Sequence, residues 1–270
     1  MRRRSVQSGE CTIAKNQPAG GQAPVVQRIR IRYAKRGPLR FTSHRDFARA
    51  FERALRRATV PVAYSQGFTP HPKISYASAA PTGVASEAEY LEIGLQARVD
   101  PAELRAALDA ALSPGLDVLA AVEAADGTSL ADRIQASHWL IELPGVEPES
   151  AAAAVTAFLT ASEVLVERMT KHGRRSFDSR AAVISLDAPS PSPAPSGDGA
   201  APCAIMDLVV RQVTPAVRPD DVLSGLHVVA GLEPPVPPRV TRLAQGLLTA
   251  QGDIVDPLDT DREGMSIGGR

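Results

Sequence analysis

Alternation of apolar and polar residues with a period of two predicts strands along much of the chain. In residues 28–34 the arginines alternate with Ile29, Ile31 and Tyr33, which is typical of a strand with one face buried. The outer face of this strand would carry Arg28, Arg30 and Arg32. By the same pattern we expect further strands at residues 73–79, 88–95, 116–122, 137–144, 164–171, 180–186, 203–210 and 239–243.

A helical period separates several of these strands. Ser43 is a suitable N-cap for a helix over residues 44–58, with Phe47 and Phe51 on one side and a row of arginines on the other. Asp100 followed by Pro101 marks the start of a second helix. Two more helices are expected at residues 148–161 and 219–229.

The order of these elements predicts the fold. Residues 25–126 follow the order β-α-β-β-α-β of a ferredoxin-like unit, and residues 127–250 follow it more loosely. We therefore predict an α+β protein made of two ferredoxin-like units with antiparallel sheets. Residues 1–24 and the acidic residues 251–270 are expected to be disordered tails, and the segment rich in proline and serine at 188–202 a disordered insertion.

Composition narrows the class of protein. No apolar run among the 270 residues approaches the ~20 needed to span a bilayer, and no apolar stretch follows the arginines at the N-terminus as in a secretory signal. Cys11 and Cys203 are too few for a disulfide framework or a cysteine metal site. We expect a cytoplasmic protein with no cofactor, no metal and no membrane association.

The formal net charge of zero conceals an uneven distribution. Residues 26–75 contain twelve lysines and arginines and two carboxylates, whereas residues 76–270 contain fourteen and twenty-seven. Such a basic segment in an otherwise acidic chain favours an anionic partner.

Aromatic residues lie among these positive charges, as in proteins that stack bases of single-stranded RNA. Arginine adds planar contacts to phosphate. Lys35, Arg36 and Arg40 extend the basic group, although a merely solvated face or buried aromatic rings would give the same pattern. The candidate RNA-binding residues are Arg28, Arg30, Arg32, Arg45, Arg49, Arg53, Arg56, Tyr64, Phe68, His71 and Lys73, with a second basic island at Lys171, Arg174 and Arg175.

Two alternatives to simple RNA binding stay open. His44 or His71 could act as a general base toward a ribose hydroxyl, with Tyr64 and Lys73 nearby, as in the ferredoxin-like endoribonucleases of CRISPR systems. Against this, His44 can simply join the helix cap, and Pro70 and Pro72 hold His71 rigid. The loop at residues 63–77 could also dock on another protein without any RNA.

Three motifs carry a family resemblance: FTSHRD at residues 41–46, YSQGFTPHPKISYA at 64–77 and SEAEYLEI at 86–93. Over residues 26–122 the chain resembles the radical-SAM-linked family of bacterial proteins, a domain of unknown function fused to, or encoded beside, a radical-SAM enzyme. The resemblance implies an accessory role in RNA modification or processing, with a separately encoded radical-SAM enzyme as partner. Because its iron–sulfur cluster needs three cysteine thiolates and this chain has two cysteines, the radical chemistry would belong to that partner. The leading hypothesis is a non-catalytic, RNA-binding accessory protein.

Overall fold

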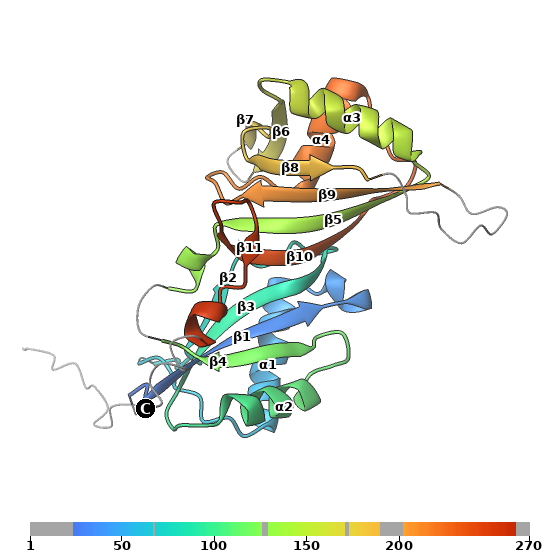
Figure 1. Cartoon of the computed structure of the whole chain (residues 1–270). Helices are drawn as coiled ribbons and strands as arrows, with labels where there is room; N and C mark the ends of the chain where they lie inside the picture. Colours follow the sequence, from blue (N-terminus) through green and yellow to red (C-terminus); the bar gives the residue numbers. More distant parts are fainter. Residues whose placement is uncertain (1–23, 67, 126–128, 171–172, 190–201, 263–270) are drawn as a thin grey trace, which may run out of the picture.

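A computed structural model describes residues 24–66, 68–125, 129–170, 173–189 and 202–262. The fold is α+β, with one large, mostly antiparallel sheet of nine strands and a separate two-stranded sheet (Figure 1). No helix in the described ranges is long and apolar enough to cross a membrane. The tail predicted at 1–24 and the insertion predicted at 188–202 lie almost wholly outside these ranges.

The first half of the chain contains the elements expected from its pattern. Its strands occur in the order β4-β1-β3, and β2 pairs with β3. Ile29, Ile31 and Tyr33 are buried against helices α1 and α2, as predicted. The elements are β1 (Gln27–Lys35), the 3-10 helix η1 (Gly37–Phe41), α1 (His44–Arg57), β2 (Ile74–Ala77), β3 (Ala85–Leu95), α2 (Pro101–Ala111) and β4 (Val118–Glu123).

The second half follows with the strand order β10-β5-β9-β8 and a core beneath α3 and α4. Residues 173–178, which were not predicted as a strand, form β7 and pair with β6 outside the main sheet. The elements are η2 (Ala131–Arg133), β5 (Ala136–Pro144), α3 (Pro148–Thr160), β6 (Leu165–Thr170), β7 (Gly173–Asp178), β8 (Val183–Asp187), β9 (Cys203–Arg211), α4 (Pro219–Ala230), β10 (Arg239–Leu248) and β11 (Ile254–Val255).

One edge of β3 joins the two halves into a continuous sheet. β2 is short and pairs only with the later part of β3, from Tyr90 to Ile93. The earlier part, at Ala85 and Ser86, pairs in parallel with β10 of the second half. The short β2 therefore leaves backbone groups of β3 free for the second half.

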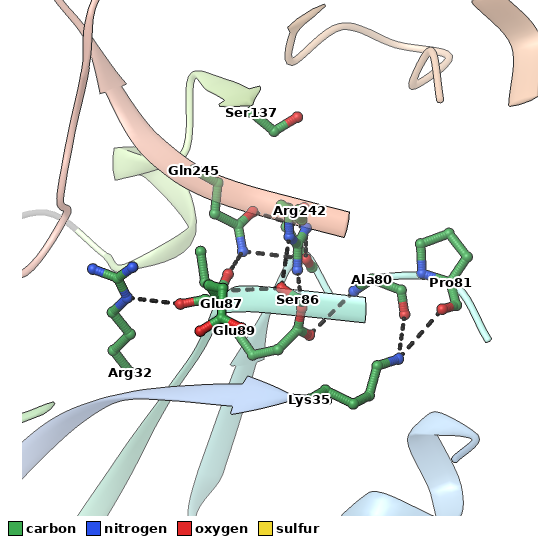
Figure 2. Close-up of polar contacts among 12 residues, drawn as sticks. Arg32, Lys35, Ala80, Pro81, Ser86, Glu87, Glu89, Ser137, Arg242 and Gln245 are labelled. Atoms are coloured by element: carbon green, nitrogen blue, oxygen red, sulfur yellow. Dashed lines mark hydrogen bonds and ion pairs between the residues drawn. The ribbon is translucent and has the colours of Figure 1, made fainter. Parts of the chain in front are cut away.

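A buried arginine crosses this junction (Figure 2). Arg242 on β10 is only 2% exposed and forms an ion pair with Glu89 on β3. Its guanidinium also donates to the Ser78 carbonyl at 2.7 Å, to Gln245 Oε1 at 3.1 Å and to Ser86 Oγ at 3.3 Å. The cation on one half is thus satisfied largely by acceptors on the other.

Lys35 is a second cation in the same cluster. Its Nζ donates to the carbonyls of Ala80 and Pro81, both at 3.3 Å (Figure 2). Burial lowers the pKa of Lys35, the charge of Glu89 raises it, and the charge of Arg242 lowers it again. The Glu89 carboxylate therefore faces two buried positive charges. This finding corrects the placement of Lys35 in the exposed basic group.

The C-terminal residues 254–262, here called the C-terminal clasp, pack on the sheet face of the first half that lies away from α1 and α2. Leu258 is fully buried against Tyr90 and Val122. The Asp261 carboxylate, also fully buried, accepts from Arg30 Nη1 at 2.9 Å and from Arg133 Nη1 at 2.8 Å. The prediction that residues 251–270 are disordered is therefore wrong over residues 251–262. The carboxylates of Asp256 and Asp261 pair with arginines far away in the sequence, which a local pattern does not show.

We expect Asp261→Asn to lower the free energy of unfolding by about 3–5 kcal/mol, because it removes the buried negative charge that Arg30 and Arg133 share. Urea unfolding followed by circular dichroism measures the change. The matched control is Asp259→Asn, which removes a half-exposed carboxylate paired with Arg262 and should cost less than about 1 kcal/mol. Equal effects of the two changes would show that the clasp does not stabilise the fold through Asp261.

At the junction, Glu89→Gln should destabilise the protein by about 3–5 kcal/mol, because Arg242 and Lys35 would then face each other unneutralised. Adding Lys35→Met should recover part of the loss, since one buried cation is removed. Glu87→Gln, at a partly exposed carboxylate on the same strand, is the control. A loss within about 1 kcal/mol for Glu89→Gln in the same unfolding assay would contradict the assigned role.

Candidate nucleic-acid interface

The outer face of α1 is a stripe of exposed arginines. The apolar side of the helix, with Phe47 and Phe51, is buried in the core, so the intervening positions project outward. In the described ranges none of these arginines makes an ion pair or side-chain hydrogen bond. From first to fourth the stripe runs roughly 16 Å along the axis. Its members, here called the α1 stripe, are Arg45, Arg49, Arg53, Arg56 and, beyond the sequence prediction, Arg57.

The loop that follows α1 is held by its own backbone. Tyr64 and Pro72 form an isolated bridge, and the His71 amide donates to Ser65 Oγ at 3.0 Å. The Ser65 amide in turn donates to the His71 carbonyl at 2.8 Å. Between these anchors the Phe68 side chain is fully exposed, at 103% of its reference area. The loop therefore presents an aromatic ring to solvent.

A small open hollow connects the α1 stripe with this loop. Glu52 and Arg56 line it from the helix, and Tyr64 and Pro72 line it from the loop, over an apolar floor of Leu55, Val60 and Val62. Arg56 and Tyr64, both predicted as RNA-binding residues, thus share one site. Glu52 was not predicted, although a carboxylate in the middle of an arginine-rich helix is a signal that sequence can show.

The two candidate bases lack a partner for proton transfer. The His44 ring packs edge-to-face on Tyr76, with ring centroids 4.7 Å apart. In the described ranges no carboxylate or other base hydrogen-bonds to the ring of His44 or His71. The buried Tyr76 hydroxyl has no hydrogen-bond partner in the structure, and burial, followed by the Glu52 charge, raises its pKa.

The arginines of β1 differ from those of α1. Arg30 is only 3% exposed and binds Glu92 and Asp261, so its prediction as an RNA-contacting residue is wrong. Arg32 binds Asp256 at 2.9 Å and keeps 27% of its side chain exposed. Arg28 is more exposed, although it pairs with Glu92. The C-terminal clasp therefore occupies most of the face that the sequence suggested for RNA.

Two further exposed residues, Phe41 and Lys73, lie in the segments that flank α1 in the chain. The Phe41 ring, 60% exposed, lies 4.8 Å from the Arg40 guanidinium carbon in a cation–π contact. Lys73 is exposed at the base of the loop. Arg36, by contrast, is held by Glu87 and Asp117. Phe41 and Phe68 are thus exposed aromatic rings in the segments on either side of α1, and Tyr64 lines the hollow beside Arg56.

The second basic island lies elsewhere. Arg174 and Arg175 are exposed on β7, and Arg174 pairs with Glu167 at 3.4 Å. Lys171 lies outside the described residues. The β6–β7 pair lies beside α4 and β8, at the other end of the molecule from α1 and α2 (Figure 1). The structure does not bring this island to the α1 stripe.

Residues 28–219 match the family described as "Uncharacterized protein conserved in bacteria (DUF2344)". The chain belongs to this family. In this DUF2344 chain the α1 stripe, the loop and the hollow all lie within the match, whereas β10 and the C-terminal clasp follow it.

No curated protein matches the DUF2344 chain. A solved structure of the first two RRM domains of the yeast poly(U)-binding protein Pub1 resembles it at 10% identity, covering 80% of this chain and 98% of that one. The TM-score is 0.18, so this likeness carries no argument. No group of three or more His, Cys, Asp or Glu side chains in the described part of the chain could hold a metal ion.

Proposed function

We propose that this DUF2344 protein is a non-catalytic RNA-binding protein and that RNA binds along the α1 stripe and the loop at residues 64–73. The observation that carries the proposal is a contrast among its arginines. Arg30, Arg133 and Arg242, on or beside the sheet, pair with buried carboxylates, whereas the five arginines of the α1 stripe project into solvent and pair with no carboxylate in the described part of the chain. Unpaired, closely spaced guanidinium groups repel one another and attract phosphate.

The proposal also concerns which face of the fold is used. We infer that each half is a ferredoxin-like unit, because the strand orders β4-β1-β3-β2 and β10-β5-β9-β8 repeat one arrangement, with β6 and β7 as an addition to the second. RRM domains, which use this kind of sheet, stack bases on its open face. Here the C-terminal clasp covers that face in the first unit, which favours the helical side.

Aromatic rings near the α1 stripe support RNA rather than a simple polyanion. Phe68 is fully exposed, and Tyr64 and Phe41 keep accessible surface. Bases stack on such rings at roughly 1–3 kcal/mol each, and single strands offer unstacked bases for this purpose. In the proposed complex, phosphates would contact the arginines of α1 and bases would stack on the aromatic rings that precede and follow the helix in the chain.

The partner and the location belong to the same proposal. The resemblance of the three motifs supports a separately encoded radical-SAM enzyme as the partner that receives the bound RNA, in a cytoplasmic RNA-modification or processing step. An iron–sulfur cluster of that class needs three thiolates, more than this chain contains. In this arrangement the protein presents the substrate and the partner carries out the reaction.

Reversing charge on the α1 stripe should weaken RNA binding selectively. We expect Arg53→Glu to reduce the affinity for a single-stranded oligonucleotide severalfold. The slope of log affinity against log salt concentration should also fall in magnitude by roughly one, because binding with one phosphate contact fewer releases fewer counterions. Arg49→Glu combined with Arg53→Glu should weaken binding further. Arg211→Glu, an equal charge change on β9, is the control. Fluorescence anisotropy across a salt series measures both quantities, and equal effects at Arg53 and Arg211 would overturn the proposal.

The loop offers a test of binding against catalysis. Phe68→Ala should cost about 1–3 kcal/mol of RNA binding, whereas His71→Ala should cost less. If the site were an endoribonuclease, His71→Ala or His44→Ala would leave binding intact and abolish cleavage of labelled RNA. If Phe68→Ala weakens binding to the partner enzyme but not to RNA, the loop is a protein-docking element instead.

A further inference from the structure

Glu52 is the carboxylate in the middle of the proposed RNA surface, and its position calls for an explanation. It lies one helical turn before Arg56, is half-buried, and lines the hollow beside Tyr64. In the described ranges its carboxylate has no hydrogen-bond or ion-pair partner. Asp46, the other acid on α1, is hydrogen-bonded to Ser43. A half-buried carboxylate without a protein donor keeps its acceptor oxygens available to a ligand that displaces the water in the hollow.

The walls of the hollow have the chemistry of a base-binding site. Tyr64 provides a ring for stacking from the loop side, and Pro72 and Leu55 provide apolar surface. Glu52 supplies two acceptor oxygens, and Arg56 supplies donors, from neighbouring positions on the same face of α1. A flat ligand entering from solvent would meet acceptors and donors side by side.

This combination complements one base best. The Watson–Crick edge of guanine presents an acceptor, O6, followed by two adjacent donors, N1–H and N2–H. A carboxylate can accept both donors at once in charge-assisted hydrogen bonds, while a guanidinium donates to O6. Adenine and uracil each place a single donor next to an acceptor that would repel the carboxylate. Cytosine offers the carboxylate only its N4–H.

We propose that the hollow binds an unpaired guanine of the RNA, with Glu52 accepting from N1–H and N2–H, Arg56 donating to O6 or the adjoining phosphate, and Tyr64 stacking on the base. This inference rests on the proposed function and adds a sequence preference to it. The rest of the α1 stripe then holds the flanking phosphates without reading sequence.

The experiment uses the full chain and fluorescein-labelled oligonucleotides of ten uridines, in which one central residue is replaced by guanosine, inosine, adenosine or cytidine. We expect the guanosine oligonucleotide to bind roughly tenfold more tightly than all-uridine RNA, as one good bidentate contact provides. Inosine, which lacks the N2 amino group, should lose most of this advantage. The inosine comparison needs no mutation and stands even if a variant folds poorly.

Glu52→Gln should abolish the guanosine preference while all-uridine RNA binds as well as before or better, because a negative charge is removed from the surface. The matched control, Glu103→Gln at an exposed position on α2, should leave the preference intact. A preference that survives Glu52→Gln, a preference for cytidine, or equal binding of all oligonucleotides would overturn the guanine site. In those cases, binding that remains sensitive to Arg53→Glu would leave the proposed function standing. Absence of binding to every oligonucleotide would overturn both.

Discussion

Burying an arginine removes its charge from water, and the cost is offset only where carboxylates and carbonyls surround the guanidinium. This constraint shapes the protein at two places. Arg242 can cross from the second half into the first because Glu89, Ser78 and Ser86 receive it there. The same requirement at Arg30 recruits a carboxylate from the opposite end of the chain. The contact between the two halves and the covering of one sheet face by the C-terminal clasp therefore both depend on charge compensation.

The same constraint separates the buried, ion-paired arginines of the sheet from the exposed arginines of α1. Buried arginines on a sheet face are already paired with the carboxylates that neutralise them, so few of their donors remain accessible to phosphate. The helix α1 has a different arrangement, because its apolar side alone packs in the core and its arginines need no intramolecular partner. Within the first half, exposed arginines without an intramolecular ion pair among the described residues gather on α1. Since the C-terminal clasp occupies the opposite face, the helical side is the part of the first half that can meet an anionic polymer.

Local signals in the sequence predicted most elements of the fold, whereas contacts between distant residues were not predictable. The cap at Ser43 and the alternation of Ile29, Ile31 and Tyr33 each act within a few residues, and both predictions are confirmed. Asp261, which pairs with Arg30, lies 231 residues away in the sequence. The alternation in β1 correctly predicted that Arg30 lies on the face away from the helices, but it could not show that the C-terminal clasp covers this face. For the same reason residues 251–262 read as a polar tail, although Leu258 anchors them. Within the site, the arginines and Tyr64 were predictable, but the hollow that brings Arg56 to Tyr64 depends on how the loop folds back on α1.

A carboxylate on a phosphate-binding surface has opposite effects on affinity and on selectivity. In the proposed complex, Glu52 would repel each phosphate bound along the α1 stripe and would lower the affinity for RNA in general. A base that directs two donors at the carboxylate would make the contribution of Glu52 to binding favourable. A base that directs an acceptor at it would make that contribution more unfavourable. In the proposed site the same residue would disfavour some bases and favour guanine, and specificity often needs such a repulsive element beside the attractive ones. Because arginines supply the affinity from several positions, the surface can tolerate this single unfavourable charge, and the half-buried setting of Glu52 strengthens the discrimination by reducing the screening of its charge by water.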